Sequence, residues 1–356
     1  MFKKKKYLEK IDRKRSGFKK IAGGLYLDRN ERAVTFSNKI KKDLEKVIGR
    51  LNLNHYPELD QFYSLIAEWK NVKSSNLFLT EGVSGAIKSI IENFTVPGES
   101  NIIFPHPSFA LYDVYAKMFN LKSKYLKYNN YKLNLTNIPS LIDKNTSIIF
   151  LANPNLPIEG YLDNNEIKRI ATICKQKKIL LVIDEVYYPF SKESSAELLS
   201  QYSDLIIMQS FSKAFGLAAI RLGYIIASRK NIEYISKTRT GYETNSVSMA
   251  IASYFIKNYH IIDEYINDVR EGINFLRHEL NKMMIEFNGG TNSNYIFINL
   301  NNRVKTKKII KGLKEANIFV RGNWPKPFDE GFLVSGAPKK ELKLFFKEFK
   351  ELYEKH

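Results

Sequence analysis

The sequence predicts an α/β fold, with a mostly parallel central sheet covered by helices in a large domain and a smaller α+β domain beside it. The main observation is a series of continuous apolar runs, which lie at residues 101–104, 147–151, 179–183, 204–208 and 224–227. Runs without polar alternation indicate strands that are buried on both faces, as in parallel sheets. The segments between them have helical periodicity, as at 164–177.

The second observation is a change of pattern after residue 245, where long helical stretches are followed by short strands. We expect strands at 295–300 and 331–335 and helices at 306–316 and 339–354. The length of 356 residues is enough for roughly two domains. The predicted large domain is 46–245, and the predicted small domain combines 1–45 with 246–356.

The composition excludes several classes of protein. A hydrophobic fraction of 44% excludes general disorder, and the single cysteine, Cys174, excludes a disulfide scaffold and fits a reducing compartment. No apolar run reaches about 18 residues, and no apolar stretch follows the basic start, so we expect neither a membrane span nor a signal peptide. The expected location is cytoplasmic.

The net charge of +19 comes from lysines that are spread along the whole chain. This distribution is typical of solvated surfaces, so we expect no nucleic-acid partner and take the charge only as weak support for an anionic substrate. The five histidines share no metal-ligand spacing, and no glycine-rich nucleotide motif or HExxH motif is present. We therefore expect no metal site.

The segment from Ser210 to Gly223 carries most of the chemical information. Lys213 follows the end of a predicted strand among small residues, where desolvation can lower its pKa and make the amine a nucleophile. The hydroxyls of Ser210 and Ser212 and the guanidinium of Arg221 can together bind a dianionic phosphate.

A second strand end provides a carboxylate, Asp184, and a phenol three residues later, Tyr187. A carboxylate with little water around it needs a cationic partner. A nucleophilic lysine, phosphate-binding groups and a buried aspartate are the parts needed to bind pyridoxal 5′-phosphate, which is attached through an imine and acts as an electron sink.

These residues resemble the class I/II aminotransferases of the fold-type I pyridoxal-phosphate enzymes, and the histidinol-phosphate aminotransferase group most closely. The similarity extends over about residues 20–350. The resemblance implies that Lys213 binds the cofactor covalently and then shuttles the substrate α-proton. It also implies that Asp184 pairs with the pyridine nitrogen, that Tyr187 contacts the ring hydroxyl and that Phe109 stacks on the ring.

The resemblance implies a phosphate-binding loop at Gly82, Val83 and Ser84, which open a predicted helix. Ser210, Ser212 and Arg221 would complete the phosphate site. The segment 54–57 resembles the family's R-Y-P segment, whose tyrosine reaches the cofactor of the other subunit. Tyr56 therefore implies a homodimer.

Three departures from the family pattern affect the expected site. Leu156 stands where an asparagine normally contacts the ring hydroxyl, and the neighbouring Asn155 could take over that contact, while Glu159 is extra. Phe332 stands where an arginine normally binds the substrate carboxylate.

The third departure is the N-terminal segment 27–32, which has two added arginines, Arg29 and Arg32. Arg321 keeps the position of a family arginine that is associated with a distal phosphate. We expect Arg321 to bind the anionic part of the substrate, with Arg32 as a second candidate; both added arginines could instead be surface residues.

The predicted function is pyridoxal-phosphate-dependent transfer of an amino group between a donor amino acid and a small, phosphorylated or otherwise anionic keto substrate. The alternative is decarboxylation of an amino-acid phosphate of the phosphoserine or phosphothreonine type, which a rearranged carboxylate site would suit. A regulator without enzymatic activity is disfavoured, because the sequence shows no DNA-binding segment.

Overall fold

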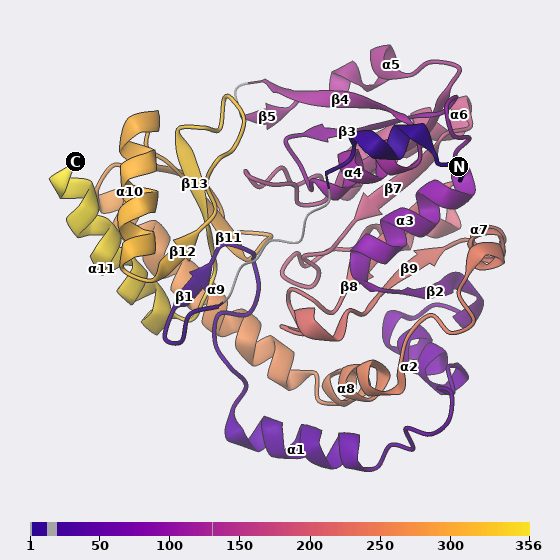
Figure 1. Cartoon of the computed structure of the whole chain (residues 1–356), viewed down its shortest axis with the longest axis horizontal. Coiled ribbons are helices and arrows are strands. Elements are labelled where there is room, and N and C mark those ends of the chain that lie inside the picture. Colours follow the sequence, from indigo (N-terminus) through magenta and orange to yellow (C-terminus); the bar gives the residue numbers. More distant parts are fainter. Residues whose placement is uncertain (1, 13–19, 130) are drawn as a thin grey trace.

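The computed structural model describes residues 2–12, 20–129 and 131–356. Its centre is an eight-stranded sheet with the order β2-β9-β8-β7-β6-β3-β4-β5 (Figure 1). The strands of this sheet are β2 (Leu77–Thr80), β3 (Asn101–His106), β4 (Lys122–Asn129), β5 (Lys132–Leu133), β6 (Thr146–Ala152), β7 (Leu180–Asp184), β8 (Leu205–Ser210) and β9 (Gly223–Ala227). All five apolar runs of the sequence form strands of this sheet.

One of the five predicted strands does not run parallel to its neighbours. β3, β4, β6, β7 and β8 pair in parallel, but β9 is antiparallel to both β8 and β2. The prediction of a parallel strand at 224–227 is therefore wrong. The reason is that the connection 211–222 contains only a single 3-10 turn, Ala218–Ile220, and so provides no helical crossover.

Helices cover both faces of the central sheet. Successive strand residues alternate between two cores, since Ile148 and Phe150 pack with α3 and α4 whereas Ile149 packs on the other face with α6. Cores on both faces explain why the runs are apolar without alternation. The helices of this part are α1 (Asn38–Gly49), α2 (Asp60–Lys70), α3 (Gly82–Phe94), α4 (Leu111–Met118), α5 (Ile138–Leu141), α6 (Asn164–Lys177), α7 (Arg229–Ile235) and α8 (Ser246–Lys257).

The C-terminal part forms two small sheets beside the central one (Figure 1). One is antiparallel with the order β10-β11-β13, and the other is the parallel pair β1-β12. The strands are β1 (Leu25–Leu27), β10 (Glu286–Gly289), β11 (Tyr295–Asn299), β12 (Ile318–Val320) and β13 (Gly331–Ser335). The helices are α9 (His260–Lys282), α10 (Arg303–Glu315) and α11 (Lys339–Lys355). β1 thus lies with the C-terminal third of the chain, while the domain boundaries stay a prediction.

Local sequence signals define α6 at both ends. Asp163 accepts a hydrogen bond from the main chain of Glu166, whose carboxylate accepts one from the main chain of Asp163, which forms a capping box. Lys178 ends the helix in the left-handed conformation. α3 differs, because no side chain caps its N-terminus.

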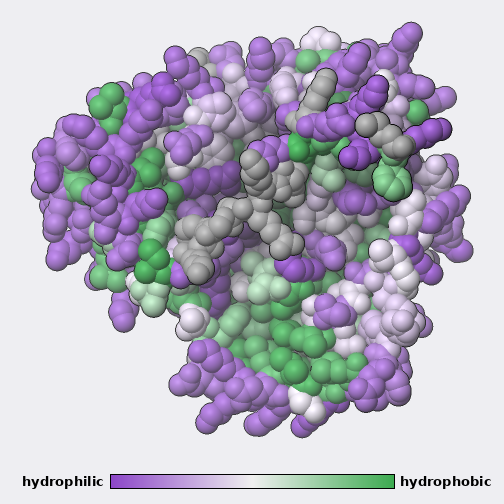
Figure 2. Space-filling view, viewed as in Figure 1, coloured by the Kyte–Doolittle hydropathy of each residue, from purple (hydrophilic) through white to green (hydrophobic). Residues whose placement is uncertain are grey.

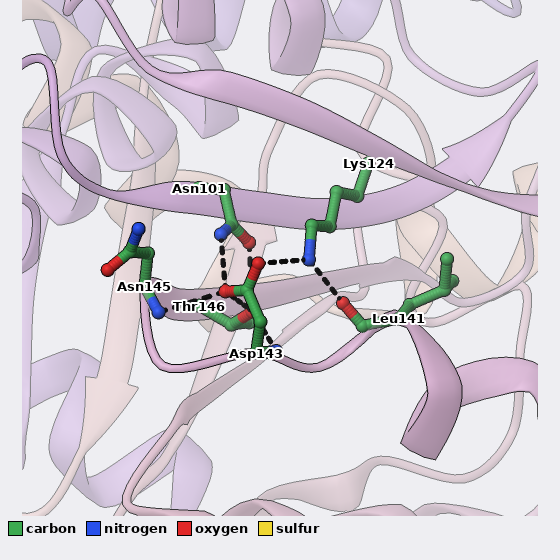
Figure 3. Close-up of polar contacts among 6 residues, drawn as sticks. All are labelled: Asn101, Lys124, Leu141, Asp143, Asn145 and Thr146. Carbon is green, nitrogen blue, oxygen red and sulfur yellow. Dashed lines mark hydrogen bonds and ion pairs between the residues drawn. The ribbon is translucent and has the colours of Figure 1, made fainter.

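A network of polar side chains joins the amino ends of β3, β4 and β6 (Figure 3). Asp143 Oδ1 accepts a hydrogen bond from Asn101 Nδ2 at 2.8 Å, and Asp143 Oδ2 lies 2.7 Å from Lys124 Nζ. The main-chain N–H of Asn145 and the Thr146 hydroxyl also donate to Oδ1. These donors, of which Lys124 has the largest effect, hold the pKa of Asp143 well below its usual value.

Hydrophilic residues cover most of the face seen in Figure 2, apart from a hydrophobic area at its lower centre. In the ranges that the structure describes, no helix is long and apolar enough to cross a membrane. The same ranges contain no group of three or more His, Cys, Asp or Glu side chains that could hold a metal ion.

Candidate active site

A cavity of about 510 Å³ lies at the carboxyl ends of β7 and β8, where ligands bind in open α/β sheets. The N-terminal segment, the start of α3 and the β12–β13 connection also contribute to its wall. Ten predicted site residues line it: Val83, Ser84, Phe109, Asp184, Tyr187, Ser210, Ser212, Lys213, Arg221 and Arg321. A cavity of this size can hold a small cofactor and part of a substrate.

Lys213 lies three residues after the end of β8, in the loop that returns to β9. Its Nζ donates a hydrogen bond to the main-chain oxygen of Arg29 at 2.7 Å. Burial lowers the pKa of Lys213 to about 8, although the Glu31 carboxylate acts in the opposite direction. A neutral amine is therefore accessible near neutral pH, as a nucleophile or a base requires.

Asp184 is the last residue of β7 and is 1% exposed. Its Oδ2 accepts a hydrogen bond from Tyr112 Oη at 2.7 Å, and its Oδ1 accepts one from the main-chain N–H of Val186. Burial nevertheless raises the pKa of Asp184 to about 6. A carboxylate in this environment is stabilised by a cationic group placed against it.

Tyr187 is also buried, and its phenolic oxygen accepts a hydrogen bond from Asn30 Nδ2 at 2.8 Å. Burial raises its pKa to about 12, so the phenol keeps its proton at neutral pH. Tyr187 is therefore a hydrogen-bond donor and not a base.

The groups suited to an anion gather at the start of α3. Gly82 has a φ of 64°, and a Cβ built there would lie 3.2 Å from the Arg221 guanidinium, so a glycine allows this close approach. Arg221 also donates to Ser84 Oγ at 3.1 Å. Ser210 and Ser212 hydrogen-bond to each other at 3.0 Å. The uncapped helix N-terminus, two hydroxyls and one guanidinium form a site for a phosphate.

Arg321 lies at another part of the wall, where its main chain pairs with that of Leu333 in β13. Its guanidinium carbon lies 4.5 Å from the centre of the Trp324 ring. Burial lowers the pKa of Arg321, so the guanidinium is poorly solvated, and an anion in the cavity would stabilise it.

β13 presents no cation to this region. Phe332 is fully buried and packs against Phe349 of α11, on the face of β13 that is turned away from the cavity. Its neighbour Leu333 packs on the opposite face with Tyr187 and Leu156. Neither Phe332 nor Leu333 lines the cavity, so β13 offers no arginine to the site at the position where the family pattern has one.

Four of the predicted residues are not among those that line the cavity: Gly82, Arg32, Asn155 and Tyr56. Arg32 packs its guanidinium over the ring of Tyr265, with 3.8 Å to the ring centre. The Asn155 amide donates to the main-chain oxygen of Pro107 and accepts from Ser108, so it is held away from the cavity. Tyr56 is 76% exposed in this single chain. Leu156, unlike Asn155, does line the cavity.

Sequence reasoning missed several residues that shape the site. Asn30 and Glu31 line the cavity beside Arg29, whereas the sequence singles out only the two arginines of this segment, Arg29 and Arg32. Tyr112, the partner of Asp184, lies three residues after Phe109, and the two rings are in edge contact at 6.0 Å. The spacing of three residues could have placed both side chains on one face of the chain.

Comparison with known proteins identifies the family. The model of the family "Aminotransferase class I and II" matches residues 21–332. The chain belongs to this family. The resemblance that the sequence suggested is confirmed, and with it the fold-type I architecture and the assignment as an enzyme that uses pyridoxal 5′-phosphate.

Individual relatives agree with this assignment. The histidinol-phosphate aminotransferase of Buchnera aphidicola subsp. Cinara cedri is 31% identical over 309 residues, which cover 85% of this chain and 84% of the relative. The structure of the enzyme of the same name from Clostridium acetobutylicum has a TM-score of 0.83, with 22% identity, covering 93% of this chain and all of that one. The L-threonine-O-3-phosphate decarboxylase from Porphyromonas gingivalis has a TM-score of 0.75, with 20% identity, covering 93% and 99% of the two chains.

The residues present fit pyridoxal 5′-phosphate on two observations of this structure. Asp184 is a buried carboxylate with a raised pKa and is suited to a cationic ring nitrogen. The start of α3, with Arg221 and the two serines, is suited to the phosphate. Both groups line the same cavity as the Lys213 amine, so one molecule can contact all three. The family's cofactor is therefore matched by this chain's own side chains.

Proposed function

We propose that the protein transfers amino groups between a donor amino acid and a small keto substrate that carries a phosphate. The observation that carries the proposal is one cavity lined by Lys213, Asp184, Tyr187 and a phosphate-binding loop. When bound there, pyridoxal 5′-phosphate supplies an electron sink that stabilises negative charge on the substrate carbon. Relatives named histidinol-phosphate aminotransferase support the substrate class.

Each side chain has a role that follows from its environment in the cavity. Lys213 Nζ, with a pKa of about 8, can take a proton from the substrate carbon and return it to another atom. The Asp184 carboxylate would keep a proton on the ring nitrogen, while Tyr187 would donate to the ring oxygen and Phe109 would cover one ring face. Val83, Ser84, Ser210, Ser212 and Arg221 would hold the cofactor phosphate, with Gly82 giving Arg221 room to approach.

Lys213→Ala tests this assignment. We expect the purified wild type to have a visible absorbance band that borohydride removes, and the variant to lack both this band and turnover. Lys70→Ala is the matched control, since burial also lowers the pKa of Lys70 to about 8, but Lys70 lies over the ring of Tyr188 and outside the cavity. Wild-type turnover in Lys213→Ala would contradict the proposal.

We further propose that Arg321 binds the anionic group of the substrate. Arg321→Ala should lower kcat/KM by a factor that corresponds to about 2–4 kcal/mol of lost transition-state stabilisation. The cofactor absorbance should stay unchanged. Arg32→Ala is the comparison, because the structure does not bring that guanidinium to the cavity. We expect it to reduce stability without changing KM. Arg321→Ala activity within twofold of wild type would rule out the anion contact.

A second candidate function is decarboxylation of an amino-acid phosphate. The observation that favours it is the absence of an arginine from β13, where Phe332 stands at the place of the family's carboxylate-binding arginine. Decarboxylation requires the carboxylate to be held out of the plane of the cofactor ring, and a carboxylate site without this arginine would suit that arrangement. Release of CO₂ from phosphoserine or phosphothreonine, without conversion of glutamate to 2-oxoglutarate, would select this alternative.

We also propose that the protein is a cytoplasmic homodimer in which Tyr56 reaches the partner's cofactor phosphate. Tyr56 is exposed and stacks on Tyr242 at 4.5 Å between ring centres, so a side chain with its hydroxyl is presented at the surface. Light scattering at micromolar concentration should give the dimer mass. A monomer that is fully active would contradict the role of Tyr56.

A further inference from the structure

Asn30 connects the two parts of the chain at the edge of the cavity. The residue is 3% exposed and has a φ of 55°, in the left-handed region that asparagine adopts more readily than most residues. Its main-chain N–H donates to Ser335 Oγ at 2.7 Å, and its main-chain oxygen accepts from Asn294 at 3.1 Å. Its side chain reaches Tyr187. None of the roles proposed above uses Asn30.

The contact with Ser335 determines which way the Asn30 amide is turned. Ser335 Oγ already accepts the main-chain N–H of Asn30, so its own hydrogen must be donated elsewhere. Asn30 Oδ1 lies 2.9 Å from Ser335 Oγ and accepts that hydrogen. A hydroxyl has a single hydrogen to donate, and the opposite amide orientation would leave that hydrogen with no acceptor among the residues that the structure describes. The Nδ2 atom therefore faces Tyr187.

This orientation in turn directs the Tyr187 hydroxyl. The phenolic oxygen accepts from Asn30 Nδ2, so the phenolic hydrogen points away from Asn30. Among the residues that the structure describes, none accepts that hydrogen. Tyr187 lines the cavity, and so does Leu156, which has no polar side-chain atom. The cavity is the place left for the hydrogen.

We propose that Asn30 is a positioning residue that directs the Tyr187 hydroxyl hydrogen into the cavity, toward the ring oxygen of the cofactor. The inference rests on the proposed function, because it takes the cavity to be the cofactor site. Since Leu156 replaces the asparagine that the family resemblance implies, Tyr187 is the donor to that oxygen, and Asn30 controls whether it donates. Ser335 fixes the orientation of Asn30 from β13.

The test is a pH titration of the visible absorbance band of the holoenzyme. A hydrogen donated to the ring oxygen withdraws negative charge from beside the imine proton, and so lowers the pH at which that proton is lost. In Asn30→Asp the new carboxylate accepts the Tyr187 hydrogen and turns it away from the cavity. We expect the midpoint of the titration to rise by roughly one unit or more. Asn30→Ala should give a smaller rise.

Two further variants separate this effect from a general loss of structure. Asn231→Asp is the matched control, because Asn231 is a buried asparagine whose side chain donates to the main-chain oxygen of Ser203 and does not line the cavity. The titration midpoint of this variant should equal that of the wild type. Tyr187→Phe removes the hydroxyl that Asn30 directs. The rise in midpoint caused by Asn30→Asp should therefore be smaller in the Tyr187→Phe protein than in the wild type, so the two changes should not be additive.

An Asn30→Asp holoenzyme with an intact band and an unmoved midpoint would overturn the inference. If that variant does not fold, Ser335→Ala decides instead: a rise in the midpoint, smaller than for Asn30→Asp, supports the inference, and an unmoved midpoint overturns it. A wild-type protein without any visible band would refute the proposed function itself, which is a different result from a band that does not respond to position 30.

Discussion

Two aspartates at opposite ends of the central sheet have opposite properties. Asp143, at the amino ends of β3, β4 and β6, is exposed and accepts hydrogen bonds from several donors, including Lys124, so its pKa is lowered (Figure 3). Asp184, at the carboxyl end of β7, is buried with fewer donors, and its pKa is raised to about 6. The charge of Asp143 is stabilised by donors of the chain itself, whereas the charge of Asp184 needs a further partner, which a ligand can supply.

The difference teaches how to separate structural from functional charges in a fold of this kind. A carboxylate surrounded by its own donors needs nothing further and contributes to holding strands together. A buried carboxylate with a raised pKa lacks partners that would stabilise its charge. A protein retains such a group where a bound ligand supplies the missing partner. The same criterion sets apart Arg321, whose guanidinium is desolvated at the cavity wall.

The largest expected effect comes from exchanging the functional aspartate. Asp184→Asn keeps the shape but removes the charge that would hold a proton on the ring nitrogen. We expect kcat to fall roughly 10³-fold or more while the cofactor remains bound. The matched control is the same exchange at the other end, Asp143→Asn, which should leave kcat near the wild-type value. Equal losses of activity in the two variants would contradict the comparison.

The second prediction concerns the pH dependence of stability without cofactor. Asp184 binds its proton more tightly in the folded chain, with a pKa of about 6, than at its ordinary value of 3.8. The contribution of Asp184 to the stability of the folded state is therefore greatest below pH 4 and falls as the pH rises to 6, by on the order of 3 kcal/mol. Urea unfolding of the wild-type and Asp184→Asn apoproteins across this range should show that loss as a difference between the two curves. Asp184→Asn should remove it, and identical curves for both proteins would contradict the prediction.

A smaller effect is expected from Tyr112→Phe, which removes the hydrogen bond that Tyr112 donates to Asp184. Without this donor the pKa of Asp184 should rise further, and kcat should fall about tenfold, corresponding to roughly 1–2 kcal/mol. Tyr224→Phe is the control, because the buried Tyr224 hydroxyl donates to Gln209 outside the cavity. A kcat for Tyr112→Phe equal to that of this control would show that the bond has no effect on Asp184.

The smallest effect is expected at the structural end. Asp143→Asn should lower the Tm slightly at neutral pH, because the ionised carboxylate holds Lys124 and Asn101. The pKa of Asp143 is lowered on folding, so its contribution is present above pH 4 and is lost as the pH falls below that value. The Tm difference between wild type and variant should therefore vanish in acid. A difference that grows in acid would contradict the lowered pKa.

Much of the fold could be predicted because burial on both faces leaves a strong pattern in the sequence. The helix at 164–177 was predicted from its helical periodicity and has these bounds in the structure. Direction was harder to predict: β9 is as apolar as its parallel neighbours, and only the short connection before it shows that it runs the other way. The strands β1 and β12 were not predicted, because three residues carry no periodicity.

For the site, the sequence was informative where the chemistry lies close together along the chain. Lys213, Ser210 and Arg221 occupy one segment, and Asp184 and Tyr187 another, and the structure brings both segments to one cavity. Contacts between distant parts of the chain were not accessible. Nothing in the sequence indicates that Asn30 meets Tyr187, or that Arg32 turns toward an aromatic ring while Arg29 reaches the wall.

The pairing of β1 with β12 has a consequence for how the protein is made. β1 leaves the ribosome early, but its partner, Ile318–Val320, follows only after almost the whole chain has been synthesised. At about 5–20 residues per second, the delay is on the order of 15–60 s. During this time the central sheet can form, while the segment that carries Asn30 has no strand to hold it. The cavity is thus covered last, so a truncated chain that ends before β12 would leave Lys213 and Asp184 open to water.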